Sequence, residues 1–299
     1  MSMNNNNYVL TCDSTVDLTP EHLRQIDVTC AKYYYILNGV EYVDDLGQTR
    51  SYKEFYNELR AGADTGTAQA NSSDFLELFT PFLEAGKDIL HVGFSSGLSG
   101  GVNSAKNAAA IALERYPDRK VYVVDSLCAS SGYGLLVDKL AELRDSGMSL
   151  EELRDWAQEN CLRMHHWFFS TDLSFYIKGG RVSRVAGTIG GILGICPLLN
   201  MDNLGRLIPR AKVPGKRRVM VEQVKRMEQF ADNGYDYNEK CYICHSDCLE
   251  DAQAVAEMVK AKFPKIRGDV LINDIGTTIG SHTGPGTVSL FFWGQKRVD

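Results

Sequence analysis

Residues 89–125 read ILHVGFSSGLSGGVNSAKNAAAIALERYPDRKVYVVD and decide the fold class. The apolar run at residues 89–94 has the length of a buried strand, and the pattern that follows predicts a helix over about residues 101–115. A second strand is predicted at residues 121–125 and a second helix over about residues 130–146. Strands that alternate with helices in this way are typical of a mostly parallel sheet covered by helices.

The segments before residue 89 extend this alternation. A strand is predicted at residues 8–12, and Asn38-Gly39 predicts a type I′ turn in a hairpin over residues 31–43. Between and after them, helices are predicted over residues 20–26, 52–60 and 73–84.

The second half of the chain has more strands and fewer helices. Its strands are predicted at residues 167–171, 195–201, 206–212, 241–245, 270–274 and 288–293. Residues 202–205 predict a hairpin turn, and hairpins imply antiparallel pairing. We therefore expect two domains: an α/β domain over residues 8–160, after a disordered leader at residues 1–7, and an α+β domain over residues 161–299. Ser149 is a predicted helix cap just before the boundary.

Composition excludes several classes of protein. The 299 residues are 44% hydrophobic and 23% charged, as in globular proteins, and the formal charge of -6 leaves no basic excess for nucleic acid. The first residues lack the pattern of a secretory signal, and the apolar stretch at residues 185–201 is short and interrupted by glycines, so no integral membrane segment is expected. We expect a cytoplasmic protein whose eight cysteines are reduced thiols.

Residues 94–101, FSSGLSGG, lie between a predicted strand and a predicted helix. Free backbone N–H groups and the helix dipole at such a junction favour an anion. The serines and glycines are consistent with a small pocket for a phosphate or carboxylate, although a capped helix start explains them equally well. The segment is no P-loop, because the Gly-Lys-Ser/Thr ending is missing.

Two further polar segments contain possible ligands for such an anion. Residues 279–286 place His282 in a predicted glycine-rich loop between two strands, where the imidazole could donate to an oxyanion. Residues 65–71 contain Thr67 in a predicted polar loop before a helix. Each segment alone is more often a solvated loop or a cap.

Two other features have competing interpretations. Cys241, Cys244, His245 and Cys248 match a short haem or metal pattern, but on a strand Cys241 and Cys244 point to opposite faces, which favours a structural role. Residues 178–184 form a basic turn that contains Arg181, either a solvated loop or a docking point for an acidic partner.

Taken together, these segments resemble the DegV family of bacterial lipid-binding proteins over about residues 8–293. The resemblance rests on the number, order and spacing of six short pieces: residues 13–18 (DSTVDL), the Thr67 segment, residues 95–100 (SSGLSG), 124–126 (VDS), 179–181 (GGR) and 282–286 (HTGPG). It implies two α/β domains with one long-chain fatty acid enclosed between them, no other cofactor, and, in some members, a role as the fatty-acid-binding subunit of a fatty acid kinase.

The resemblance also implies a set of site residues. Thr67, Ser99 and His282 would bind the carboxylate, and Ser96, Gly100 and Arg181 would support the site. The chain departs from the family pattern by having Ala68 in place of serine, Ala70 in place of proline and Gly101 in place of threonine.

The expected function is that of a carrier, without catalytic activity, that presents the carboxylate to a partner kinase. The alternative is a serine-dependent acyl hydrolase with Ser99 as nucleophile and His282 as base, although the sequence offers no clear group to orient the imidazole and lacks the Gly-x-Ser-x-Gly pattern.

Overall fold

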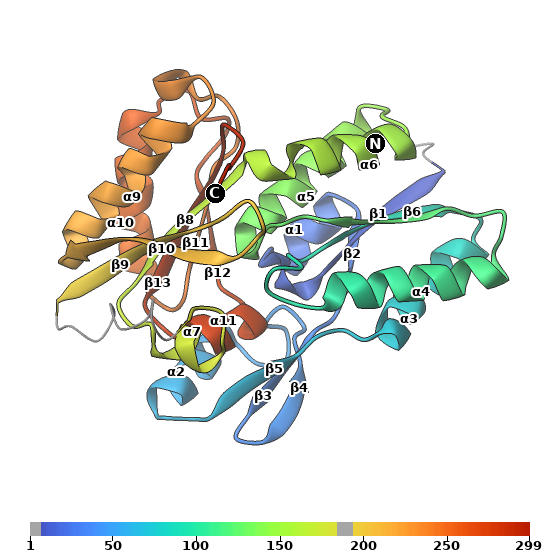
Figure 1. Cartoon of the computed structure of the whole chain (residues 1–299), viewed down its shortest axis with the longest axis horizontal. Coiled ribbons are helices and arrows are strands. Elements are labelled where there is room, and N and C mark those ends of the chain that lie inside the picture. The colour runs from blue at the N-terminus through green and yellow to red at the C-terminus, as the bar shows by residue number, and fades with distance from the viewer. Residues whose placement is uncertain (1–6, 184–193) are drawn as a thin grey trace.

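The structure, a computed structural model, describes residues 7–183 and 194–299. Most of the predicted leader, Arg184 of the basic turn and residues 185–193 of the apolar stretch lie outside the described residues. The described strands form three sheets, of four, six and three strands. Figure 1 shows the two larger sheets on opposite sides of the molecule, with the small sheet below and between them.

The four-stranded sheet is entirely parallel and has the strand order β2-β1-β6-β7. Its alternating side chains enter two cores: Val9 packs under α3 and α4, and Leu10 packs under α5 and α6. This confirms the parallel sheet predicted from the strand and helix alternation. The elements are β1 (Tyr8–Asp13), α1 (Pro20–Gln25), β2 (Val28–Ala31), α3 (Ser72–Glu84), β6 (Asp88–Gly93), α4 (Gly101–Arg115), β7 (Val121–Asp125), α5 (Ser130–Asp145) and α6 (Leu150–Asn160).

The three-stranded sheet is antiparallel, with the order β4-β3-β5. The predicted type I′ turn is confirmed, because Asn38 and Gly39 join β3 to β4 with φ angles of 51° and 81°. The predicted loop around Thr67 is wrong: it is an edge strand, too short for its alternation to be recognised in the sequence. The strands are β3 (Tyr34–Leu37), β4 (Val40–Val43) and β5 (Thr65–Ala68).

The six-stranded sheet has the order β10-β9-β8-β13-β11-β12. Its neighbours are antiparallel except β11 and β12, which are parallel because a helix connects them. This mixed sheet confirms the α+β prediction for the second half. Its elements are β8 (Met164–Ser170), β9 (Ile195–Met201), β10 (Leu207–Pro214), α9 (Lys216–Phe230), β11 (Tyr242–His245), α10 (Leu249–Lys262), β12 (Leu271–Asp274) and β13 (Thr287–Trp293).

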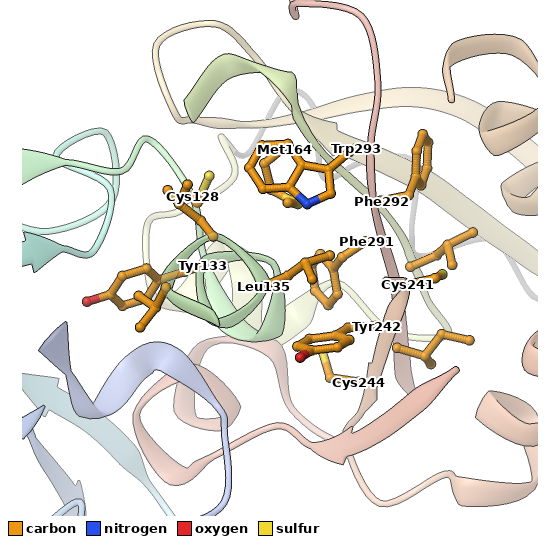
Figure 2. Close-up of a cluster of buried hydrophobic side chains, with 14 of the residues drawn as sticks. Cys128, Tyr133, Leu135, Met164, Cys241, Tyr242, Cys244, Phe291, Phe292 and Trp293 are labelled. Atoms are coloured by element: carbon orange, nitrogen blue, oxygen red, sulfur yellow. The ribbon is translucent and has the colours of Figure 1, made fainter. Parts of the chain in front are cut away.

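Helix α5 joins the two larger sheets. Figure 2 shows Leu135 directed toward Phe291 of β13, with Tyr133 on the opposite side of the helix. The Tyr133 hydroxyl donates to the carbonyl of Val92 in β6. One helix therefore packs against both sheets, and α9 and α10 cover the other face of the six-stranded sheet.

Three short helices lie between the small sheet and the six-stranded sheet: α2 (Tyr52–Arg60), α7 (Ser174–Lys178) and α11 (Thr277–Thr283). Helix α11 contacts α2, α7, β3 and β5. Elements from the two ends of the chain therefore meet at α11.

All strands of the four-stranded and three-stranded sheets precede residue 160, and all strands of the six-stranded sheet follow it. We propose on this basis that two domains meet near residue 160, where α6 ends. Ser149 caps α6 as predicted, because its hydroxyl accepts a hydrogen bond from the Glu152 amide. None of the helices in the described part of the chain combines the length and apolar character that a membrane span needs.

Candidate functional site

A cavity of about 430 Å³ lies between the six-stranded sheet and the elements that precede residue 160. Its volume is within the range of small-molecule sites. Its walls come from β5, the loop before α4, the start of α5, β8, β9, β13, α7 and α11. Segments that are more than 200 residues apart in the chain therefore line one space.

The buried part of the cavity is lined by large apolar side chains and by several polar ones, among them Ser130, His166 and Ser289. Phe168 from β8, Met201 from β9 and Phe291 from β13 line it, and each is at most 6% exposed. The opposite, polar end reaches the surface, because Thr67 and Ser99 are half-buried and Gln69 is exposed. The cavity thus runs from the surface into a largely apolar interior that also contains buried hydroxyl and imidazole groups.

Thr67 and His282 meet at this polar end. The Thr67 Oγ1 atom of β5 lies 2.7 Å from the His282 Nε2 atom of α11. The predicted loop position of His282 is wrong, because residues 277–283 are helical. Gly280, which favoured a loop, instead permits close helix packing: a Cβ there would lie 2.5 Å from the Tyr56 hydroxyl.

The His282 imidazole is neutral near pH 7. Burial lowers its pKa to about 4, and the charge of Arg181 adds to the shift. The Nδ1 atom has no hydrogen-bond partner within the described residues and lies against Gly179, where any Cβ would be 2.2 Å away. A buried N–H without a partner is costly, so the favoured tautomer carries its proton on Nε2 and donates to Thr67.

Ser99 lines the same cavity, two residues before α4. Its hydroxyl donates to Gln69 Oε1 at 3.3 Å and accepts from the Gly101 amide at 3.2 Å. The α4 N-terminus adds a favourable field for an anion. The sequence analysis did not identify Gln69 as part of the site. This residue lies two positions after Thr67, and its Oε1 atom accepts the Ser99 hydroxyl hydrogen that a bound anion would also need.

The other residues predicted from residues 94–101 do not line the cavity. Ser96 is exposed, and its amide donates to the carboxylate of Asp125 at 3.2 Å. Gly100 caps α4 and lies under the Gln69 side chain, where a Cβ would be 2.8 Å from Oε1. Gly100 therefore allows Gln69 to approach, whereas Ser96 is directed elsewhere.

Arg181 lines the cavity and also connects its two walls. The guanidinium donates to the Leu98 carbonyl at 3.2 Å and 3.3 Å, and to the Gly179 carbonyl at 2.6 Å. Half burial lowers its pKa from the ordinary value, which leaves it charged. The Arg181 cation therefore contributes positive charge at the polar end as well as a link between the walls.

The DSTVDL segment holds the surrounding elements together. The buried Asp13 carboxylate accepts from the Phe94 amide at 2.9 Å, and the buried Asp17 carboxylate accepts from the Gly276 amide at 2.9 Å. Burial raises the pKa of Asp13 to about 6, although the hydrogen bond from the Phe94 amide acts to lower this pKa. The segment thus fixes the loops that approach the cavity from both halves of the chain.

The cysteine cluster lies in the core instead of at the cavity's polar end. Cys241 and Cys244 are fully buried, and Cys244 Sγ lies 3.1 Å from the Ser130 hydroxyl. Cys248 Sγ donates to the Thr287 carbonyl at 3.2 Å. Across residues 7–183 and 194–299, no group of three or more His, Cys, Asp or Glu side chains is arranged to hold a metal ion.

Comparisons with known proteins agree over nearly the whole chain. A family model described as uncharacterised proteins of the DegV family matches residues 8–295. A DegV domain-containing protein of Clostridium perfringens is 36% identical over 290 residues, covering 97% of this chain and 98% of that relative.

Solved structures of similar fold include two with a described lipid. A fatty-acid-binding DegV family protein from Thermus thermophilus has a TM-score of 0.85 and 27% identity, covering 96% of this chain and 99% of its own. The fatty acid kinase B3 protein of Streptococcus pneumoniae, loaded with linoleic acid, has a TM-score of 0.83 and 22% identity, covering 96% and 99%. The sequence match and the shared fold establish that this chain belongs to the DegV family.

Proposed function

We propose that this chain binds one long-chain fatty acid, with the tail in the apolar part of the cavity and the carboxylate at Thr67, Ser99 and His282. The observation that carries the proposal is that one cavity joins the half-buried Thr67, Ser99 and His282 to a buried wall that is largely apolar. An amphipathic ligand with one polar end matches this arrangement.

The tail supplies most of the binding free energy. Each methylene moved from water into an apolar site contributes about 0.8 kcal/mol, so about 14 methylenes contribute roughly 11 kcal/mol before the costs of association. The buried residues Phe168, Met201 and Phe291 provide an environment of this kind.

The carboxylate end is bound by hydrogen bonds instead of an ion pair with His282. Because a carboxylate only accepts, Thr67 would donate its hydroxyl hydrogen to the ligand while accepting from His282 Nε2. Ser99 would turn its hydrogen from Gln69 Oε1 to the ligand. Hydrogen bonds to a charged group are about twice as strong as neutral ones, which favours this exchange.

We further propose that the rim position of the carboxylate serves a partner. Thr67 and Ser99 are half-buried, so a bound carboxylate would lie near the surface, within reach of a kinase that forms an acyl phosphate. The similarity to the fatty acid kinase B3 protein of Streptococcus pneumoniae supports such a partner. The carrier would act in the cytoplasm and would itself perform no catalytic step.

The geometry favours this carrier over an acyl hydrolase. Among the described residues, the Ser99 hydroxyl pairs with Gln69 and His282 pairs with Thr67, so Ser99 and His282 form no nucleophile and base pair. The partnerless Nδ1 atom also leaves His282 without a carboxylate to orient it.

We expect the protein purified from bacterial cells to contain about one fatty acid per chain. Native mass spectrometry would show a mass increase equal to one fatty acid, and organic extraction followed by mass spectrometry would identify it. An unliganded protein that also fails to take up added fatty acid would contradict the proposed function.

A further inference from the structure

Two residues that line the cavity carry a buried polar atom without a hydrogen-bond partner in the described part of the chain: His282 and Tyr33. The unpaired His282 Nδ1 atom is covered by Gly179. Tyr33 is only 2% exposed, and its hydroxyl lies near the Ser99 hydroxyl, but the two form no hydrogen bond of normal geometry. A buried hydroxyl without a partner costs free energy unless a ligand supplies the missing acceptor.

The position of Tyr33 is fixed from both ends. Its backbone amide donates to the Ser14 hydroxyl at 3.0 Å, within the DSTVDL segment. Its hydroxyl occupies the space beside Gly101, where a Cβ would lie 1.8 Å from the Tyr33 oxygen. A side chain at position 101 and the Tyr33 hydroxyl therefore exclude each other.

Resting on the proposed function, we propose that the Tyr33 phenol is a third donor to the fatty acid carboxylate, beside the Thr67 and Ser99 hydroxyls, and takes the place of a hydroxyl from position 101. Ser99 Oγ, the Gly101 amide and the Tyr33 hydroxyl lie around one point at the start of α4. Burial raises the pKa of Tyr33 well above its ordinary value, and the charge of Asp13 adds to the rise. The nearby Ser99 hydroxyl lowers this pKa, because it can donate to the phenolate. The phenol thus keeps its proton and can donate to an anion.

The first test compares Tyr33→Phe with Tyr34→Phe, using palmitate and palmityl alcohol as probes of delipidated protein. Tyr34 is the matched control, because its hydroxyl donates to Asp74 and it does not line the cavity. We expect Tyr33→Phe to weaken palmitate binding by roughly 10- to 100-fold, the range for a hydrogen bond to a charge, and to change alcohol binding much less. An equal loss for both probes would indicate packing alone and would overturn the inference.

The second test uses the exclusion between positions 33 and 101. Gly101→Ser in the wild-type background should displace the Tyr33 hydroxyl and weaken palmitate binding. In a Tyr33→Leu background the same Gly101→Ser change should strengthen palmitate binding, because the space is open and a hydroxyl returns. A change of the same sign in both backgrounds would contradict the inference, and thermal unfolding identifies any variant that fails to fold.

The two proposals fail in different ways. If wild-type protein does not bind palmitate, the proposed function is overturned. If wild-type protein binds palmitate and Ser99→Ala weakens it, but Tyr33→Phe binds as tightly as wild type, the role of Tyr33 alone is overturned.

Discussion

Shortening the fatty acid by four methylene groups is expected to weaken its binding by about 3.2 kcal/mol, or roughly 200-fold, because each buried methylene contributes about 0.8 kcal/mol. The apolar lining of the cavity leads to this expectation, since large buried side chains such as Phe168, Met201 and Phe291 are available to contact the tail. Isothermal titration of delipidated protein with saturated acids of decreasing length measures the slope. The slope should hold until the acid becomes too long for the cavity.

A cavity variant separates burial in this site from binding elsewhere. Leu207→Trp enlarges a side chain on the cavity wall and should reduce the affinity for acids that fill the cavity. Ile111→Trp is the control, because Ile111 is 50% exposed on α4 and does not line the cavity. An affinity that is insensitive to chain length, or equally affected by both variants, would contradict burial of the tail here.

Thr67→Val is expected to weaken fatty acid binding by roughly 1 to 3 kcal/mol, the cost of losing a hydrogen bond to a charged group. His282→Ala should also weaken binding, because Thr67 loses the donor that orients its hydroxyl. The combined effect of both substitutions should be smaller than the sum, because His282 acts on the ligand through the Thr67 hydroxyl, 2.7 Å away. Titrations of the two single variants and the double variant provide the coupling energy. Thr65→Val is the control, since this hydroxyl lies on the same strand and donates to Ser281.

The same titrations have an expected pH profile. Burial lowers the pKa of His282 to about 4, below the ordinary value of about 6.5, so the imidazole is uncharged from pH 6.5 to pH 8. Affinity for the fatty acid should therefore be constant over this interval. If binding needed the imidazolium, affinity would rise as the pH fell through the interval. For the double variant, additive effects of Thr67→Val and His282→Ala would contradict an action of His282 through Thr67.

Much of the fold could be predicted because its strands and helices are long and clearly patterned. Helix α4 and strand β7 begin and end where the apolar pattern places them, and Asn38-Gly39 specifies its turn through two positive φ angles. The misassigned segments are short, and each contains one glycine. Residues 65–68 and 277–283 become regular through contacts with β3 and α2, which the local sequence does not reveal.

The site was predictable as a set of residues but not as a geometry. Local residue types and the family resemblance indicated Thr67, Ser99 and His282, and the structure places all three on one cavity. The roles of Gln69 and Tyr33 depend on contacts between segments 30 or more residues apart in the chain, such as the Ser99 bond to Gln69. The absence of a side chain at Gly101 was visible in the sequence, but the tyrosine that fills the space was not.

The central claim is that one cavity holds the tail while the carboxylate lies at Thr67, Ser99 and His282. A crystal structure of delipidated protein, soaked with a fatty acid that has bromine on its terminal carbon, tests both ends together. We predict an anomalous bromine peak among Phe168, Met201 and Phe291, and carboxylate density within hydrogen-bonding distance of Thr67 and Ser99. Bromine on the protein surface, or a carboxylate far from these hydroxyls, would contradict the account.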